Sequence, residues 1–229
     1  IPGRGYSTYA LRILLPENVG RMGLKIETIS TAYRVYVDGV LLGGIGKAEK
    51  TEKESVPQYI VDFYSFEASQ QETIIVIQVS NFFHRKGGIW EGISLAGESS
   101  MRKQWIKDIA SAIFLISAIL IMGLYHIGIY LQRKVEYPSL YFGTFCLIIV
   151  LRTLATGEIF LTQLFPNLPW IVQIKLEYIT FYTALPVFML YMYNLFPADF
   201  KKPIYRIFNI IGVVFSIFVL LTPAYVFSY

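Results

Sequence analysis

Residues 80–91, with the sequence SNFFHRKGGIWE, carry the side chains best suited to contacting a small molecule. Asn81, His84 and Arg85 offer hydrogen-bond donors and acceptors, and Trp90 offers a flat apolar face that can stack on a ring or a cation. The two adjacent glycines allow the main chain to turn tightly. Two interpretations stay open: these side chains contact a ligand, or the segment packs against other elements and transmits movement.

The sequence gives no indication of catalysis. It contains no P-loop and no GxGxxG, HExxH or GxSxG motif. The two histidines, His84 and His126, lie far apart in the sequence, and Cys146 is the single cysteine, so no His/Cys metal site is expected. We therefore expect no enzyme activity, no metal and no cofactor in this chain.

The elements that hold these residues change character at Asp108. Residues 1–108 contain 13 Lys or Arg and 12 Asp or Glu, whereas residues 109–229 contain 7 and 4. The first part is nearly neutral and has no dense basic block, which argues against a nucleic-acid partner. Residues 109–131 include no Asp, Glu, Lys or Arg. As a helix they would extend about 35 Å, enough to cross the roughly 30 Å apolar core of a bilayer.

Residues 1–107 have the pattern of a β domain. Short apolar runs alternate with turns, and Asp38-Gly39 between two such runs is a strong hairpin signal. The run at residues 73–79 has apolar residues on both faces, which indicates a central, covered strand. The pattern predicts a β-sandwich or jelly roll with strands at residues 9–15, 24–29, 33–37 and 73–79.

Residues 108–229 are predicted to form a transmembrane bundle. Four apolar helices are expected at about residues 109–131, 138–155, 168–195 and 204–227. The first and third loops between them are basic, with Arg133 and Lys134 in one and Lys201 and Lys202 in the other. The positive-inside rule puts these loops in the cytoplasm and the β domain outside.

Arg152 and Glu177 are charges inside the second and third predicted helices. Both are expected at a similar depth in the outer half of the bundle, so the sequence predicts an intramembrane ion pair. Such a pair either locks two helices together or changes with the state of the β domain, and both interpretations stay open.

Several ordered motifs resemble one bacterial family, the seven-transmembrane receptors with diverse intracellular signalling modules. In the β domain these are GYSTYALRILLP (5–16), STAYRVYVDGVLLGGIGK (30–47) and IIVIQVSNFFHRKGGIWEGISLAG (74–97). In the bundle these are LIMGLYHIGIYLQRK (120–134), SLYFGTFCLIIVLRTLATGE (139–158) and LPWIVQIKLEYITFYTALPVF (168–188). The resemblance covers nearly the whole chain.

The resemblance implies a jelly-roll, galactose-binding-like ectodomain, here expected to lack its beginning. It also implies seven helices, of which this sequence carries four, and a cytoplasmic output such as a histidine kinase or a cyclase beyond residue 229. The expected location is the bacterial inner membrane, with several membrane passes and the N-terminal domain in the periplasm.

The leading functional hypothesis is a transmembrane receptor that senses a periplasmic ligand. The expected partners are membrane lipid, a small molecule such as a carbohydrate, and a second copy of the chain in a homodimer. The alternative is a membrane-anchored carbohydrate-binding or envelope-assembly protein without signalling output. A transporter would need more ionisable residues near the bilayer midplane than Arg152 and Glu177 provide.

Overall fold

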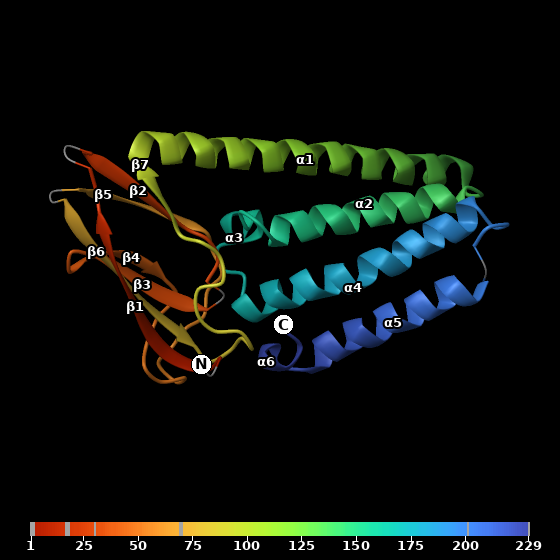
Figure 1. Ribbon diagram of the computed structural model, residues 1–229. Helices are drawn as coiled ribbons and strands as arrows, with labels where there is room; N and C mark the ends of the chain where they lie inside the picture. The colour runs from red at the N-terminus through yellow and green to blue at the C-terminus, as the bar shows by residue number, and fades with distance from the viewer. Residues whose placement is uncertain (1–2, 17–18, 30, 69–70, 201, 229) are drawn as a thin grey trace. The chain divides into compact units, whose positions relative to one another are not determined.

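The computed structural model describes residues 3–16, 19–29, 31–68, 71–200 and 202–228. The chain divides into two compact units. The β unit consists of residues 1–109 together with 224–229, and the helical unit consists of residues 110–223. The predicted order of sheets first and helices second is therefore confirmed (Figure 1).

The β unit contains two antiparallel sheets. The larger has the strand order β1-β6-β3-β4, and the smaller has the order β5-β2-β7. The strands are β1 (Gly5–Leu14), β2 (Arg21–Ile26), β3 (Ala32–Val37), β4 (Val40–Ile45), β5 (Asp62–Glu67), β6 (Glu72–Asn81) and β7 (Ser94–Gly97). The sequence-based expectation covers β1, β2, β3, β4 and β6, whereas β5 and β7 are absent from it.

An apolar core shared by both sheets makes the β unit a sandwich. Leu24 of β2 and Val35 of β3 have no exposed surface, because alternate residues of each strand point inward. Tyr33 of β3 also reaches across the core, with its hydroxyl 3.3 Å from the hydroxyl of Tyr64 on β5. Burial raises the pKa of both tyrosines, so both stay protonated and one donates to the other.

The hairpin and the central strand take the predicted places. Asp38 has a φ of 48° and Gly39 a φ of 81°, as a tight two-residue turn between β3 and β4 requires. Strand β6 lies between β1 and β3, so its central position is confirmed. The expectation that both its faces are covered is wrong for the outer face, where Ile74 is 43% exposed.

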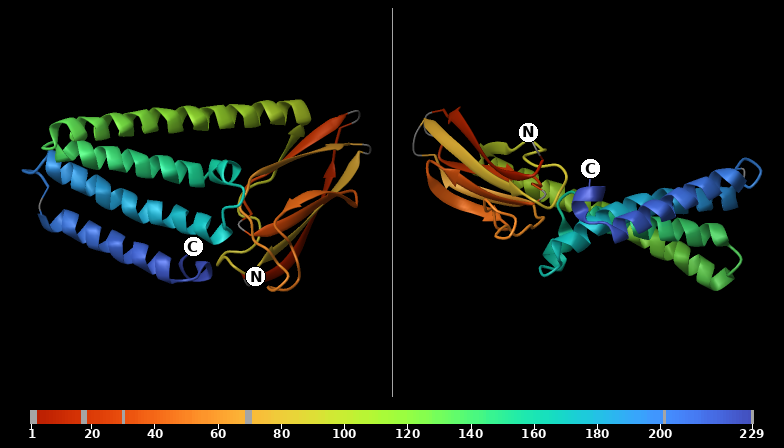
Figure 2. Two further views of the ribbon diagram at one scale, coloured as in Figure 1. Left: turned by 180° about the vertical axis from the view of Figure 1, so that it is seen from behind. Right: turned by 90° about the horizontal axis from the view of Figure 1, so that it is seen from below.

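The helical unit is built mainly from four long helices (Figure 2). Helix α4 packs against α2 on one side and α5 on the other. The helices are α1 (Glu98–Arg133), α2 (Tyr137–Ala155), α3 (Phe160–Leu164), α4 (Trp170–Leu195), α5 (Lys202–Leu221) and α6 (Ala224–Phe227). The first turns of α1 and the whole of α6 belong to the β unit.

Three helices in the described chain are long and apolar enough to cross a membrane: α1, α2 and α5. Four spans are expected from the sequence, and the third of them, residues 168–195, corresponds to α4. This helix is long, but by composition it is not among the helices apolar enough to cross a membrane. Lys175, Glu177 and several tyrosines make α4 less apolar than its neighbours.

Two helix ends differ from the prediction. Helix α1 begins at Glu98, eleven residues before the first expected helix at residues 109–131. Helix α5 ends at Leu221 rather than at residue 227. Pro223 explains that end, because proline has no N–H to donate and restricts the residue before it to extended conformations.

Glycines allow two close helix crossings. A Cβ at Gly123 of α1 would lie 3.3 Å from the carbonyl oxygen of Gly143 on α2, so the two backbones nearly touch. A Cβ at Gly212 of α5 would lie 2.7 Å from the carbonyl oxygen of Tyr182 on α4 and would collide with the ring of Pro186. Pro186 leaves that carbonyl without its helical donor, and a glycine in the facing helix leaves room for it.

Candidate functional site

The first turns of α1 lie on the outer face of the sheet β5-β2-β7, which we call the helix-bearing face. Met101 packs on Gly23 of β2, where a Cβ would lie 3.1 Å from the Met101 Cβ. The ring of Trp105 stacks on the ring of Phe63 from β5, with centroids 5.7 Å apart and planes 15° apart. The guanidinium of Arg102 lies 5.3 Å from the Phe63 centroid. Apolar packing thus fixes α1 along the sheet.

Glu98 anchors the beginning of α1 to this face. Its carboxylate accepts hydrogen bonds from Arg102 at 3.1 Å and from the hydroxyl of Ser65 on β5 at 2.9 Å. It also forms an ion pair with Arg21 of β2 at 3.2 Å. The hydrogen bond from Arg102, followed by that from Ser65, lowers the pKa of Glu98, so the carboxylate stays charged beside the positive end of the helix dipole.

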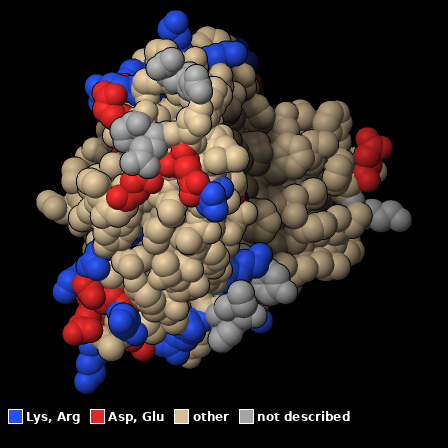
Figure 3. Space-filling view, turned by 60° about the vertical axis from the view of Figure 1, so that its left-hand side comes forward, with Lys and Arg blue, Asp and Glu red and all other residues tan. Residues whose placement is uncertain are grey.

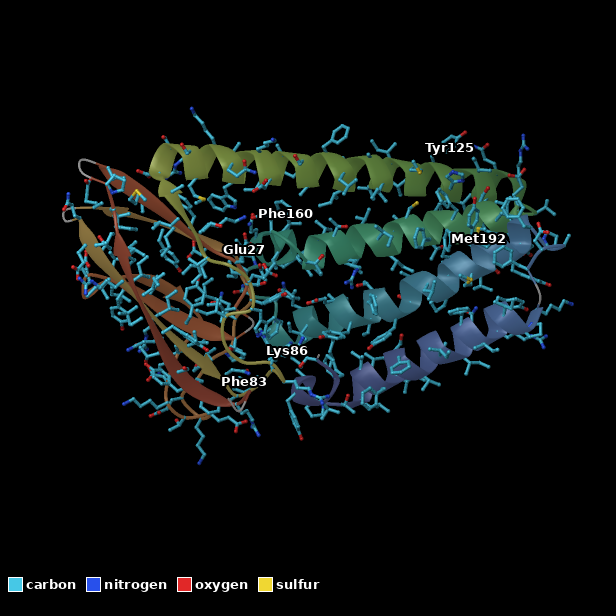
Figure 4. The ribbon with its side chains drawn as sticks, viewed as in Figure 1. Glu27, Phe83, Lys86, Tyr125, Phe160 and Met192 are labelled. Atoms are coloured by element: carbon cyan, nitrogen blue, oxygen red, sulfur yellow. The ribbon has the colours of Figure 1, made fainter. Side chains whose placement is uncertain are left out.

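Lys25 anchors α1 about three turns further along. It is only 7% exposed, and its ammonium lies 3.1 Å from Glu27 and 4.0 Å from Asp108 of α1. Gln104 donates to the same Asp108 carboxylate at 2.8 Å. Burial and the charge of Glu27 raise the pKa of Glu91, which shares this environment. Carboxylates from three separate segments therefore surround one buried ammonium; Glu27 is labelled in Figure 4.

The segment after β6 is organised by Asn81. Its amide nitrogen donates to the main-chain carbonyls of Gly3, His84 and Lys86, and its amide oxygen accepts from the His84 N–H at 2.9 Å. Phe83 and Lys86 of this segment are labelled in Figure 4. These bonds occupy the whole Asn81 amide, which therefore shapes the main chain of the segment.

His84 is buried and Trp90 covers its ring. His84 is 3% exposed, its ring centroid lies 4.7 Å from that of Trp90, and its Nδ1 accepts from the Lys86 N–H at 3.2 Å. Burial lowers the pKa of His84 to about 4, so the ring is neutral at physiological pH. Trp90 is 40% exposed and its indole N–H donates to the carbonyl of Gly87 at 3.3 Å.

The same segment contacts the residues that follow α5. The N–H of Arg85 donates to the hydroxyl of Ser228 at 3.1 Å. The guanidinium of Arg4 lies 5.6 Å from the ring centroid of Tyr225 in α6. Both contacts lie within the β unit, so this unit holds the start of α1 and also the stretch after α5.

The four candidate residues Asn81, His84, Arg85 and Trp90 thus lie together in one folded segment. Asn81 and His84 serve the internal structure of the segment, and the Arg85 main chain meets Ser228. These contacts show how the segment packs, whereas transmission of movement and contact with a ligand both stay predictions.

Arg152 of α2 contacts α4 at Glu177, and the predicted ion pair between their side chains stays a prediction. The Arg152 guanidinium donates a hydrogen bond of 2.8 Å to the main-chain carbonyl of Glu177. The guanidinium also lies 5.0 Å from the ring centroid of Phe181. Nearby, Lys175 of α4 donates to the carbonyl of Leu220 at 2.7 Å and so caps the end of α5. These cations bind helix carbonyls, so they join α4 to α2 and to α5.

Sequence reasoning missed Arg4, Tyr225, Ser228 and the central position of Lys25. The alternation of β2 does place Lys25 on the face opposite the core, but no local pattern shows that α1 covers that face. The contacts to residues 225 and 228 join positions more than a hundred residues apart, for which a single sequence carries no signal.

A sandwich of water-compatible sheets joined to helices that can span a bilayer defines the class: a membrane protein with a folded domain outside the lipid. Residues 109–229 match the model of a family described as 7TM diverse intracellular signalling. The chain belongs to this family, as the motifs on both sides of Asp108 suggest. A comparison with curated proteins found no match.

Solved structures similar to this chain include three glycoside hydrolases. The β-galacturonidase of Eisenbergiella tayi, bound to galacturonate, is 17% identical with a TM-score of 0.30 over 40% of this chain and 17% of that one. A family 2 β-glucuronidase is 22% identical with a TM-score of 0.31 over 40% of this chain and 11% of that one. The β-glucuronidase of Bacteroides uniformis is 16% identical with a TM-score of 0.28 over 40% and 12%. The chain spans less than a fifth of each enzyme, and no statement about its activity follows.

Proposed function

We propose that this chain is the sensing and membrane part of a receptor in the bacterial inner membrane. Its β unit, a jelly roll in the periplasm, binds a small molecule of the carbohydrate class. The helices carry the resulting change to a cytoplasmic signalling module. Membership of the signalling family supports the general class, and the proposal assigns no chemical reaction to residues 1–229.

The observation that carries the proposal is the continuity of α1. One helix contributes its first turns to the helix-bearing face and its later turns to the apolar span. From Glu98 to Met122 it contains neither glycine nor proline, so no local hinge separates the two parts. A ligand that favours one arrangement of the β unit would therefore shift the population of helix positions.

Loop charges support the orientation. Arg133 ends α1 and Lys134 follows it, and Lys202 and Arg206 lie at the start of α5, whereas Glu158 is the one charge of residues 156–167. The positive-inside rule then puts the β unit in the periplasm and the basic turns in the cytoplasm.

The test interrupts α1 where it leaves the sheet. Six Gly/Ser residues are inserted after Asp108, beyond the contacts of Trp105 and Asp108 with the sheet, in the full chain in lipid nanodiscs and in a Cys146→Ser background. Spin labels at positions 133 and 202 report the distance between the two basic turns. The receptor proposal expects the insertion to broaden or shift that distance distribution, because α1 no longer transmits the position of the sheet.

A matched control carries the same six residues after Lys50, in an exposed stretch of the β unit. This control should leave the distance distribution as in the parent chain. An unchanged distribution after the α1 insertion would favour the membrane-anchored binding protein, in which the helices serve only as an anchor.

A further inference from the structure

A cavity of about 350 Å³ opens in the β unit beside the ends of β1 and β6. Its lining includes Tyr6, Ser7 and Tyr9 of β1, Asn81 of β6, and the pair Gly87 and Gly88. The volume falls at the low end of the range of small-molecule sites, roughly 300–1,000 Å³.

Glycines make this cavity. Gly3 and Gly87 lie so close that a Cβ on either would collide with the main chain of the other segment. Gly88 has a φ of 89°, and a Cβ there would lie 2.7 Å from the Tyr9 hydroxyl. The part of the lining that these glycines form therefore carries no side-chain bulk.

The lining favours a neutral ligand with hydroxyl groups. Ser7 and Tyr9 lie on the same face of β1, and in the described chain no hydrogen bond engages their hydroxyls, so both can donate to and accept from a ligand. Arg4, the charged residue of the lining, already binds Glu52 at 2.9 Å and the Phe82 carbonyl at 2.9 Å. The Tyr9 ring beside Gly88 adds a flat face that suits the apolar side of a sugar ring.

Two of the lining residues also hold the stretch after α5. Arg4 lies over the ring of Tyr225. Asn81 fixes the carbonyls of His84 and Lys86, on either side of Arg85, whose N–H binds Ser228. A molecule in the cavity therefore contacts the side chains that set the position of residues 225 and 228.

We propose that this cavity binds a neutral, hydroxyl-bearing ring of monosaccharide size, and that Arg4 and Asn81 report its presence to residues 224–228. The binding stands on the cavity alone, and the reporting step rests on the proposed receptor function. The inference places the ligand beside β1, whereas His84 and Trp90 contribute to the fold of the neighbouring segment.

The binding test uses calorimetry on the chain in nanodiscs with four probes: glucose, galactose, glucuronate and galacturonate. We expect at least one neutral sugar to bind saturably and its uronate to bind at least tenfold more weakly, since no unpaired cation awaits the carboxylate. Equal or tighter binding of the uronates, or no binding of either neutral sugar, overturns the ligand class.

Two variants locate the site. Ser7→Trp fills the cavity and should abolish binding, while Thr8→Trp adds the same ring to the opposite face of β1 and should leave it unchanged. Tyr9→Phe removes one hydroxyl with little effect on folding and should weaken binding roughly threefold to tenfold. Unchanged affinity in both Ser7→Trp and Tyr9→Phe overturns the location.

The reporting step is read by hydrogen exchange at residues 224–228. Sugar binding should slow exchange there in the parent chain, and Tyr225→Leu should remove this protection while affinity stays within about threefold. Equal protection in Tyr225→Leu overturns the reporting step. If a sugar binds but the α1 insertion leaves the spin-label distances unchanged, the binding site is supported and the receptor function is rejected. If the insertion changes the distances but no sugar binds, the receptor function is supported and the binding site is rejected.

Discussion

The β unit and the helical unit use apolar side chains in opposite ways. In the β unit they lie inside, in one core shared by two sheets. In the helical unit many lie outside: Phe114 of α1 is 76% exposed and Leu221 of α5 is 81% exposed. Charged side chains show the same division on the face drawn in Figure 3, where they gather mainly over the β unit. One chain is thus folded for two solvents, water for the sheets and lipid for the helices.

The two units also satisfy polar groups differently. In the β unit, side chains such as Asn81 and Thr31 bind main-chain atoms far away in the sequence. In the helical unit eight hydroxyl and amide side chains bind the carbonyl four residues earlier: Thr144, Thr153, Thr156, Thr180, Thr183, Asn194, Asn209 and Thr222. Helix association therefore depends mainly on close glycine crossings and aromatic contacts.

The largest expected effect comes from removing a leucine side chain from each unit, one inside the β core and one on the outside of a helix. Leu24→Ala should cost about 2 to 5 kcal/mol of unfolding free energy, because Leu24 is fully buried in the sandwich. Leu124→Ala on α1, where the side chain is 56% exposed, should cost less than about 1 kcal/mol. Denaturant unfolding in nanodiscs, followed by tryptophan fluorescence, measures both. Equal costs would show that α1 packs on protein at this position.

The second test concerns the buried charge of the helix-bearing face. Lys25→Met should destabilise the β unit by about 1 to 3 kcal/mol, because the half-buried carboxylates of Glu27 and Asp108 lose their buried partner. Lys50→Met, at an exposed position, is the control and should be nearly neutral. A neutral or stabilising Lys25→Met would show that these carboxylates are hydrated in the folded protein.

The third test uses the pH dependence of the unfolding free energy, which His84 gives to the β unit. The pKa of His84 falls from 6.5 to about 4 on folding, so the unfolded chain binds more protons in that range. Stability should therefore be complete above pH 6.5 and decline as the pH falls towards 4, by about 2 to 3 kcal/mol. His84→Gln should flatten the profile between these limits when unfolding is measured across the range. An equally steep profile in the variant would assign the dependence to other groups.

The smallest expected effect concerns the glycine crossings. Gly212→Ala should cost about 1 to 3 kcal/mol, because the new methyl group collides with Pro186 and the Tyr182 carbonyl. Gly128→Ala adds the same methyl in open space on α1 and should be neutral or slightly stabilising. Thermal unfolding followed at the helical circular dichroism band compares the two. A neutral Gly212→Ala would show that α4 and α5 separate without loss.

The periodic elements could be predicted from the sequence. Alternation identifies β2 and β3, the Asp-Gly turn joins β3 to β4, and long apolar runs locate α1, α2 and α5. Strand β5 was not predicted because it has no alternation of apolar and polar residues: aromatic residues occupy both of its faces, one in the core and the other under Trp105. Strand β7 has four residues, too few to show a period.

The candidate site was predictable only in part. The segment around Asn81 stood out through its side-chain types, but the Asn81 bonds to Gly3, His84 and Lys86 depend on the folded path of the main chain. The helical start of α1 is likewise a tertiary effect. Residues 98–107 are polar enough to read as a linker, and contact with Gly23 and Phe63 gives their apolar side a surface to cover.

The division of the chain into units has a further consequence. The chain leaves the β unit after residue 109 and returns to it at residue 224, so the helical unit is an insertion with both ends held by one folded body. Such an insertion is a closed loop, and ordering its ends restricts every helix between them. Because the β unit already fixes both ends, ordering the helices costs less chain entropy than it would for a segment with two free ends.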